Sequence, residues 1–268
     1  MISDDIWAKP PRPKNGICFV SGKVSLVGIG PGSIDDMTPR AESTLRKVSV
    51  IIGHKTCLEM IGPIYRNTAK EIIAEDLTPV ERSRIAVDRA LNGAEVAIVT
   101  TGDPGIFAIA STFFGYLREK GIIVSVDVIP GVTTANAAAS LLGSPLGKDF
   151  AVISLSDMAS PWNDIKSRLE SAAIADFVIA LYNPKGKAGN RRLKKAINIL
   201  MDYDKASTPV GIVTDAARET ENVQITTLGD VLSCHIDTQS ILIVGNSQTY
   251  VFDGRMVTPR EYREGIGY

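Results

Sequence analysis

Short apolar runs alternate with amphipathic stretches along this chain from residue 23 onward. Four runs in the first half are rich in valine and isoleucine and short enough to be buried strands: residues 23–27, 48–52, 95–99 and 122–126. Helices are predicted at residues 78–93, from after the Asp103 loop to Lys120, and, beyond the fourth strand, at residues 135–142. The first of these helices opens with a capping box and a proline and stops at a glycine. Strands that alternate with helices in this way predict a largely parallel sheet.

The second half repeats the alternation with different strands. They are predicted at residues 150–155, 177–182, 210–214, 223–227 and 241–244. Between the second and third strands, apolar residues recur at helical spacing from Leu193 to Met201 and predict an amphipathic helix.

The fold class that follows is α/β, with two α/β domains whose loops face a shared cleft. Glycine, serine and proline gather at residues 143–147, as is typical of a linker. We therefore expect domains at residues 23–143 and 148–268, preceded by a flexible, proline-containing arm at residues 1–22.

A glycine turn with one carboxylate follows the third predicted strand, at residues 100–105 (TTGDPG). Open α/β sheets bind ligands at the carboxyl ends of their strands, and Gly102 lets the backbone approach a ligand closely. Asp103 supplies one fixed negative charge, which suits a cationic ligand better than a phosphate. An aspartate here is also a candidate N-cap for the next helix, and this alternative stays open.

The first strand also ends in a glycine-rich run, residues 28–32 (GIGPG). A dinucleotide fingerprint would need glycine where Ser33 stands, and Pro31 lacks the N–H that a pyrophosphate would use. Asp35 and Asp36 add negative charge at the same place. A nicotinamide or flavin nucleotide is therefore a distant alternative for the ligand. The plainest alternative is that both glycine-containing segments are ordinary strand-to-helix turns.

The composition excludes several classes of partner and location for this protein. Hydrophobic residues make up 44% and charged residues 22% of the chain, and the net charge of −1 provides no field for nucleic acid or an anionic membrane. No apolar run is long enough to span a membrane, and residues 1–22 contain no secretory apolar region. Three scattered cysteines and two histidines form no metal pattern. We expect a cytoplasmic protein with no bound metal, no nucleic-acid partner and no membrane partner.

Four segments in a fixed order resemble the tetrapyrrole methylase family: residues 28–32 (GIGPG), 102–104 (GDP), 130–134 (PGVTT) and 208–210 (TPV). The resemblance covers nearly the whole chain from Val24 and implies two domains and S-adenosylmethionine as cofactor. Further markers are similar to a subgroup that methylates carbon 17 of precorrin-3B, or its cobalt form, and contracts the ring: residues 181–185 (LYNPK), 208–213 (TPVGIV), 245–249 (GNSQT) and 256–260 (MVTPR).

The chain departs from that subgroup at three places. His54 stands where the subgroup usually has tyrosine, residues 214–217 (TDAA) replace an arginine-asparagine-alanine-glycine run, and Glu261 replaces a glycine. Another regiospecific precorrin or uroporphyrinogen methylase therefore stays open as an alternative. A non-catalytic module that binds S-adenosylmethionine is a second alternative.

The resemblance implies a cofactor site built from loops of both domains. Its expected residues are Pro31, Thr101, Gly102, Asp103, Ile106, Phe107, Thr133, Thr134, Leu181, Tyr182, Pro209 and Val210. The two threonines are equally well explained as helix N-caps, and the apolar members as ordinary core residues.

The implied substrate is a tetrapyrrole with many carboxylates, which requires cations at the rim of the cleft. Lys185, Lys187 and Arg191 follow the turn at residues 183–184 and are the candidates, whereas we expect Arg192, Lys194 and Lys195 to form a solvated face. Ring contraction moves protons, so Asp35 and His54 are candidate acid–base groups. The resemblance also implies a homodimer.

Overall fold

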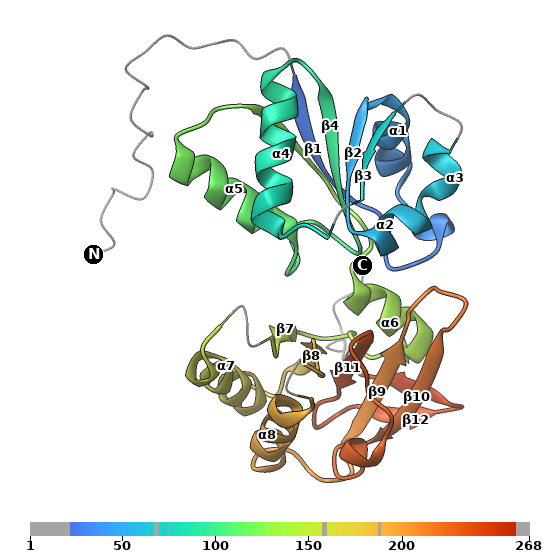
Figure 1. Cartoon of the computed structure of the whole chain (residues 1–268). Coiled ribbons are helices and arrows are strands. Elements are labelled where there is room, and N and C mark those ends of the chain that lie inside the picture. Colours follow the sequence, from blue (N-terminus) through green and yellow to red (C-terminus); the bar gives the residue numbers. More distant parts are fainter. Residues whose placement is uncertain (1–21, 67–69, 75, 157–159, 187–188, 261–268) are drawn as a thin grey trace, which may run out of the picture.

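The computed structural model describes residues 22–66, 70–74, 76–156, 160–186 and 189–260. The predicted N-terminal arm lies outside these residues, apart from Gly22. Figure 1 shows two layered halves, one above the other, each built around its own sheet. None of the described helices is both long and apolar enough to cross a membrane.

The first sheet is entirely parallel, as the pattern predicted. Its strands run in the order β3-β2-β4-β1-β5, with β1 at Lys23–Gly28, β2 at Val50–Ile52, β3 at Glu71–Ile73, β4 at Glu95–Thr100 and β5 at Ser125–Ile129. Strand β5 begins three residues later than predicted, because Gly121 ends the preceding helix in a left-handed conformation and the Ile122 N–H still bonds to the Leu117 carbonyl.

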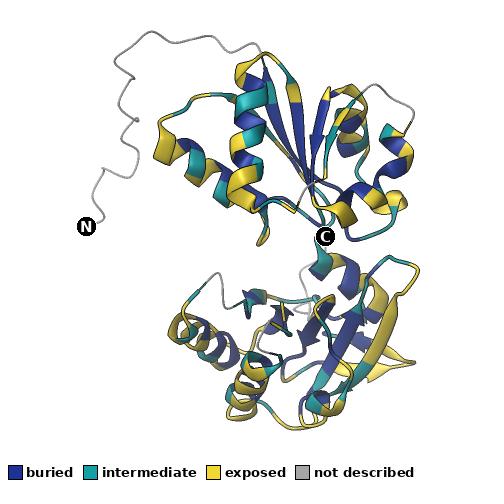
Figure 2. Cartoon of the chain, viewed as in Figure 1, coloured by how far each residue is buried: buried dark blue, intermediate teal, exposed yellow. Residues whose placement is uncertain are grey.

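Helices cover both faces of this sheet. On one face lie α4 (Pro79–Leu91) and α5 (Ile109–Lys120), and on the other α1 (Pro39–Lys47), α2 (Lys55–Met60) and α3 (Gly62–Tyr65). Helix α4 starts with the predicted capping box, in which Thr78 and Glu81 satisfy each other's backbone N–H groups. The dark blue strands in Figure 2 show that the core of this half lies between the two helical layers.

The second sheet is mixed, which differs from the predicted parallel alternation. Its order is β10-β9-β11-β8-β7, with β7 at Phe150–Ser154, β8 at Val178–Tyr182, β9 at Pro209–Thr214, β10 at Asn222–Thr227 and β11 at Ser240–Val244. Only β7 and β8 pair in parallel. Residues 215–221 are too few for the crossover helix that parallel neighbours need, so β9 and β10 form an antiparallel hairpin.

The second sheet is also covered on both faces. Helices α7 (Trp162–Ile174) and α8 (Arg191–Met201) pack on one face, and α6 (Thr134–Leu142) packs on the other. A small three-stranded sheet completes this half, with β6 at Gly143–Ser144, β12 at Tyr250–Phe252 and β13 at Arg255–Val257.

Helix α6 and residues 143–144 thus belong by packing to the second sheet. From the sequence, we expected α6 to belong to the first domain and residues 143–147 to form a linker. In the structure, β6 pairs with β13, and the α6 residues Ala138 and Leu142 are buried against the second sheet. An alternating strand–helix pattern does not say which sheet a helix covers. The domain bounds themselves stay a prediction.

Candidate active site

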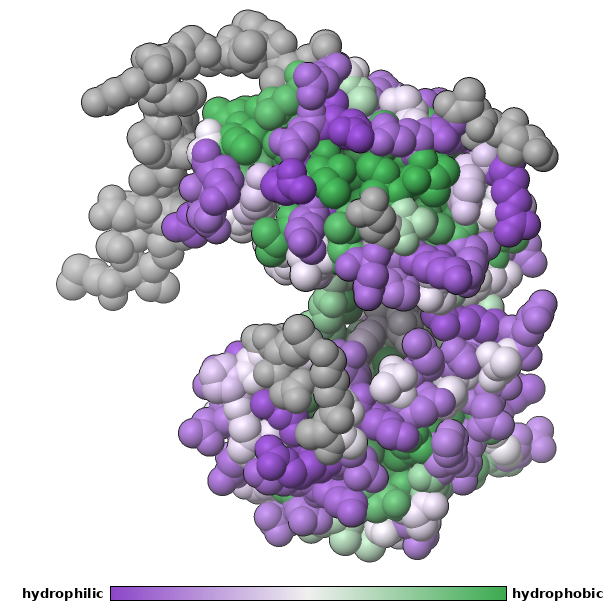
Figure 3. Space-filling model, in the orientation of Figure 1, coloured by the Kyte–Doolittle hydropathy of each residue, from purple (hydrophilic) through white to green (hydrophobic). Residues whose placement is uncertain are grey.

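A cavity of about 230 Å³ lies between the two halves, where strands of both sheets end. It is far larger than one water molecule needs, and Figure 3 shows the surface indented between the halves. Residues from both halves line it: Pro31, Thr100, Thr101, Gly102, Asp103, Ile106, Phe107, Ala108, Thr133, Thr134, Tyr182, Asn183, Asp215, Ala216, Arg218, Thr238, Gln239, Ser240 and Ile241.

Three loops of the first sheet meet at this cavity through their backbones. The Gly-rich loop (residues 28–32) and the loop after β4 form a bridge in which Gly30 and Gly102 exchange N–H···O bonds of 3.3 and 2.8 Å. A Cβ atom on Gly131 would lie only 2.2 Å from the Gly102 carbonyl oxygen. Glycine is therefore required by the closeness of the loops, which explains these glycines without a dinucleotide.

Asp103 ties two of these loops together. Its Oδ1 accepts the Gly105 N–H at 2.7 Å, and its Oδ2 accepts the Gly131 N–H at 3.1 Å. It is not the N-cap of α5, because that position belongs to Ala108. Asp103 therefore shapes the site through two charge-assisted bonds and leaves its negative charge beside the cavity.

Two apolar side chains follow Asp103 and face solvent: Ile106 is 43% and Phe107 54% exposed. Phe107 has a φ of +51°, an uncommon conformation for a bulky residue. Its ring meets that of Tyr182 edge-on, with centroids 5.4 Å apart. Exposed apolar surface in a strained loop is typical of a segment that contacts a ligand.

Tyr182 caps α6 from the neighbouring strand. Its hydroxyl accepts the Ala135 N–H at 2.8 Å and lies 2.7 Å from Oγ1 of Thr133. Thr133 occupies the N-cap position of α6, but its side chain makes no capping bond to the helix. Tyr182 therefore makes the capping bond that we considered for the threonine as an alternative role. The same contacts fix the loop that carries Thr133 and Thr134.

Three expected cofactor residues do not line the cavity. Leu181 and Val210 are completely buried in the core of the second half. Pro209 begins β9, whereas the cavity lies at the other end of that strand, beside Asp215. The expectation for residues 209 and 210 came from the resemblance; β8 and β9 are both antiparallel to β11 and so run in the same direction, and the Asp215 end of β9 is the one that reaches the cavity.

The acid–base and substrate candidates lie outside the cavity lining. Asp35 is exposed in the short 3-10 helix Ile34–Asp36, and His54 caps α2 by accepting the Thr56 N–H at Nδ1, 3.3 Å away. Lys185 is half-buried shortly after Asn183, and Arg191 is exposed at the start of α8. Lys187 lies outside the described residues.

Arg192 differs from the solvated face that we expected. One terminal nitrogen donates to the Ser156 carbonyl at 2.8 Å, and the guanidinium lies over the Trp162 ring, 5.9 Å from its centroid. It therefore anchors the segment between β7 and α7 and is not free for a substrate.

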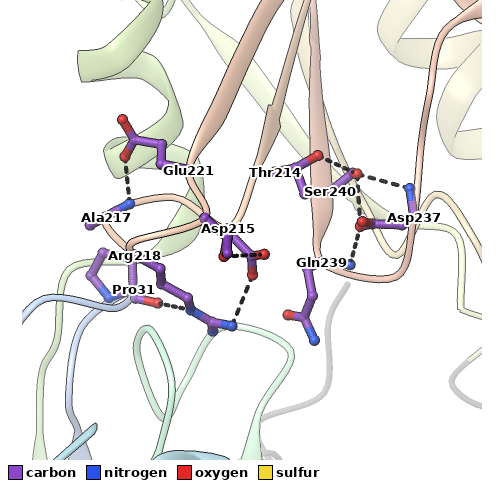
Figure 4. Close-up of polar contacts among 10 residues, drawn as sticks. Pro31, Thr214, Asp215, Ala217, Arg218, Glu221, Asp237, Gln239 and Ser240 are labelled. Carbon is purple, nitrogen blue, oxygen red and sulfur yellow. Dashed lines mark hydrogen bonds and ion pairs between the residues drawn. The ribbon is translucent and has the colours of Figure 1, made fainter.

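The sequence missed the side of the cavity that we call the C-terminal wall, formed by Asp215, Ala216, Arg218 and residues 238–241. Ser240 joins this wall together, because its hydroxyl bonds to Thr214 and Asp237 (Figure 4). No motif marks these residues. The only available signal was the departure from the subgroup at residues 214–217.

Two subgroup markers are structural and lie away from the cavity. Asn246 holds the turn before β12 through Thr249 and through the Asp176 carbonyl, and Thr249 bonds to Thr258 at 2.7 Å. These contacts lie at the end of the second sheet opposite the cavity. Among the described residues no cluster of three or more His, Cys, Asp or Glu side chains could hold a metal ion.

Asp204 lies at the same end of the second sheet, and its surroundings shift the pKa of its carboxyl group. Burial, with a smaller contribution from Asp176, raises the pKa of the Asp204 carboxyl from 3.8 to about 6. The folded state therefore binds this proton more tightly than the unfolded state does. Its contribution to stability is present below pH 4 and is lost as the pH rises through about 6.

Replacing Asp204 with asparagine is expected to stabilise the protein at pH 7 to 8 and to have little effect near pH 4. The raised pKa corresponds to at most about 3 kcal/mol, and screening of a half-exposed carboxyl reduces the expected gain to about 1 kcal/mol. Urea denaturation at both pH values measures it, with Asp202→Asn as control. Equal effects of Asp204→Asn at the two pH values would contradict the assignment.

Comparisons with known proteins agree with this geometry. The family model "Tetrapyrrole (Corrin/Porphyrin) Methylases" matches residues 23–232. This chain belongs to the tetrapyrrole methylase family. The methylase model covers the first sheet and strands β7 to β10 of the second, together with every cavity-lining residue except residues 238–241.

Several relatives within the family have specific names. The "Cobalt-factor III methyltransferase" of Priestia megaterium is 41% identical over 91% of this chain, which spans only 46% of that protein. The "Probable cobalt-factor III C(17)-methyltransferase" of Salmonella typhimurium is 40% identical over 89% of this chain and 99% of its own length. A solved structure titled "Crystal structure of the methyltransferase CobJ" is 28% identical, with a TM-score of 0.82 over 89% of this chain and all of that one.

Proposed function

We propose that this chain is an S-adenosylmethionine-dependent methyltransferase that methylates carbon 17 of a corrin precursor and contributes to ring contraction in cobalamin biosynthesis. The substrate is precorrin-3B or its cobalt form; the relatives named above act, by their names, on cobalt-factor III. The observation that carries the proposal is one cavity lined by three of the four family segments, residues 28–32, 102–104 and 130–134, in a chain that aligns with nearly the full length of a relative named for this reaction.

The cavity residues fit S-adenosylmethionine. The donor carries a sulfonium, an ammonium and one carboxylate, and the charged side chains that line the described cavity are Asp103, Asp215 and Arg218. Ile106, Phe107 and Ile241 offer apolar surface to adenine, and Thr101 and Thr134 offer hydroxyls to ribose or carboxylate oxygens.

When bound, the cofactor supplies an activated methyl group, so the protein's task is orientation. A well-aligned pair of reactants gains roughly 7–11 kcal/mol relative to free encounter. Asp103 fixes the loop after β4 against Gly131, and Tyr182 fixes Thr133 at the start of α6. These contacts fix the walls of the cavity against one another, which is what orientation requires.

For proton transfer during ring contraction, we propose Asp35 or His54 as the acid–base group. Asp35 is the better placed of the two, because it follows the Gly-rich loop, whose Pro31 lines the cavity. His54 lies over a separate depression together with Lys55 and Asp76, and its Nδ1 already accepts a backbone N–H.

The direct test incubates the protein with methyl-labelled S-adenosylmethionine and either metal-free precorrin-3B or cobalt-factor III, and locates the new methyl group by NMR. We expect label on carbon 17 of a contracted ring. Label on another carbon would support the alternative of a different regiospecific methylase. Binding of S-adenosylmethionine without turnover on either substrate would support the non-catalytic module.

Substrate capture by Lys185, Lys187 and Arg191 gives a further prediction. Neutralising all three should raise the KM for the macrocycle several-fold and flatten its salt dependence, because rim charges act on encounter within a screening length of about 8 Å. Cofactor affinity should change little. A wild-type KM at low salt would show that these residues are only a solvated face.

We also propose a cytoplasmic homodimer. The edge strand β10 is exposed, and an apolar group near it on β12 is exposed as well, since Val251 is 48% and Phe252 71% accessible. Contiguous apolar surface beside an unpaired strand is typical of an interface. Light scattering at micromolar concentration should give the dimer mass, and a monomer mass would contradict it.

A further inference from the structure

The segment between β9 and β10, residues 215–221, reaches from the C-terminal half to the Gly-rich loop. Nε of Arg218 donates to the Pro31 carbonyl at 3.3 Å. A Cβ atom on Gly32 would lie 2.4 Å from Cγ of Arg218 and 2.6 Å from the Ala217 carbonyl oxygen. The two loops are therefore in direct contact, and they belong to different sheets.

Asp215 holds the guanidinium that makes this contact. Its Oδ1 accepts from a terminal nitrogen of Arg218 at 3.1 Å, and its Oδ2 accepts the Thr220 hydroxyl at 2.8 Å. The side chains of Arg218 and Asp215 are only 21% and 20% exposed. Figure 4 shows the guanidinium between the Pro31 carbonyl and the Asp215 carboxylate. A partly buried ion pair of this kind is screened far less than a surface pair.

The backbone of the same segment is held in an uncommon shape. Asp215 has a φ of +51° and Ala217 a φ of +59°, although neither is glycine. The Ala217 N–H donates to Oε2 of Glu221 at 2.7 Å, which closes the turn around Asp215 (Figure 4). Such conformations persist only where surrounding contacts determine them, and they gather at functional sites.

We propose that Asp215 and Arg218 are positioning residues that hold the Gly-rich loop against the C-terminal wall and so set the width of the cavity. The expected effect on catalysis rests on the proposed function. The expected effect on the position of the Gly-rich loop does not. Arg218 lines the cavity, yet its Nε and one terminal nitrogen are already bonded within the protein. This geometry favours fixing Pro31 in place over the capture of a ligand carboxylate.

The test compares Arg218→Gln, Asp215→Asn, the double variant and Arg218→Lys with the wild type. The control is Arg84→Gln, which removes an exposed ion pair to Asp88 on α4. We expect Arg218→Gln to lower kcat about tenfold and to weaken S-adenosylhomocysteine binding several-fold, since orientation is lost. The double variant should be no worse than Arg218→Gln, because the two residues act as one unit. Arg218→Lys should recover only part of the activity, since one ammonium cannot reproduce the two-sided contact.

A ligand-free measurement separates this inference from the proposed function. Amide exchange of the peptide containing Gly32 and Ser33 should be faster in Arg218→Gln than in the wild type and unchanged in Arg84→Gln. If wild-type protein binds no S-adenosylhomocysteine, the proposed function fails, and the exchange result alone decides whether the contact holds the loop.

Two outcomes overturn the inference. Unchanged exchange at this peptide in Arg218→Gln would show that the contact does not hold the loop. A rise in the KM for the macrocycle alone, with kcat and cofactor affinity unchanged, would show that Arg218 binds a substrate carboxylate instead.

Discussion

Asp103→Ala is expected to lower S-adenosylhomocysteine affinity at least about tenfold and to lower the free energy of unfolding by about 3 kcal/mol. The carboxylate accepts N–H groups from Gly105 and Gly131, and bonds to a charged acceptor contribute roughly 1.5–3 kcal/mol each. Without it, the loop that carries Thr133 and Thr134 loses its tie to the loop after β4. Calorimetric titration and urea denaturation measure the two effects.

Asp103→Asn provides the matched comparison. It keeps one oxygen acceptor but loses the charge, so its two effects should be smaller than those of alanine. Asp88→Ala, which removes an exposed carboxylate on α4, should change neither quantity. If Asp103→Ala binds the cofactor normally and melts at the wild-type temperature, Asp103 does not organise the site.

Gly131→Ala should destabilise the protein by about 3 kcal/mol or prevent folding at 37 °C. The new Cβ would lie 2.2 Å from the Gly102 carbonyl oxygen and 2.8 Å from the Gly28 carbonyl carbon. Overpacking usually costs 1–3 kcal/mol, and here the neighbours are backbone atoms that cannot rotate away. Thermal melting followed by circular dichroism measures the change.

Gly115→Ala is the control for the same chemical change in open space. This glycine lies inside α5, and nothing stands within 4 Å of the position of its Cβ. The substitution should stabilise the helix by roughly 0.5–1 kcal/mol. If Gly131→Ala behaves like Gly115→Ala, the three loops do not pack as closely as described.

Local signals predicted much of the fold. The capping box at Thr78 and Gly121 at the end of α5 placed these two helices correctly, because capping depends on neighbouring residues alone. The direction of the strands after residue 200 could not be predicted in this way. It depends on connection length and on partners far away in sequence, as β11 shows by inserting between β8 and β9.

The candidate site was also predicted only where it depends on local sequence and parallel strands. The loops after β1, β4 and β5 were predicted to meet, since parallel strands bring their carboxyl ends to one edge. The C-terminal wall was missed, because Ser240 begins its strand and Asp215 follows one, and only an antiparallel pairing brings them together. Leu181 and Tyr182 were both expected at the cofactor, but side chains alternate along a strand, so Leu181 lies in the core while Tyr182 reaches the cavity.

The two loop anchors described above leave a very short pivot between the halves. Gly131 is bonded to Asp103 in the first half, whereas Thr133 and Ala135 are bonded to Tyr182 in the second. Only Val132 lies between them, so any rotation of one half against the other must be absorbed by the backbone dihedrals of about three residues. Those residues lead directly into Thr133 and Thr134, which line the cavity. Under the proposed function, a movement that opens the two halves therefore also reshapes the site of the methyl donor.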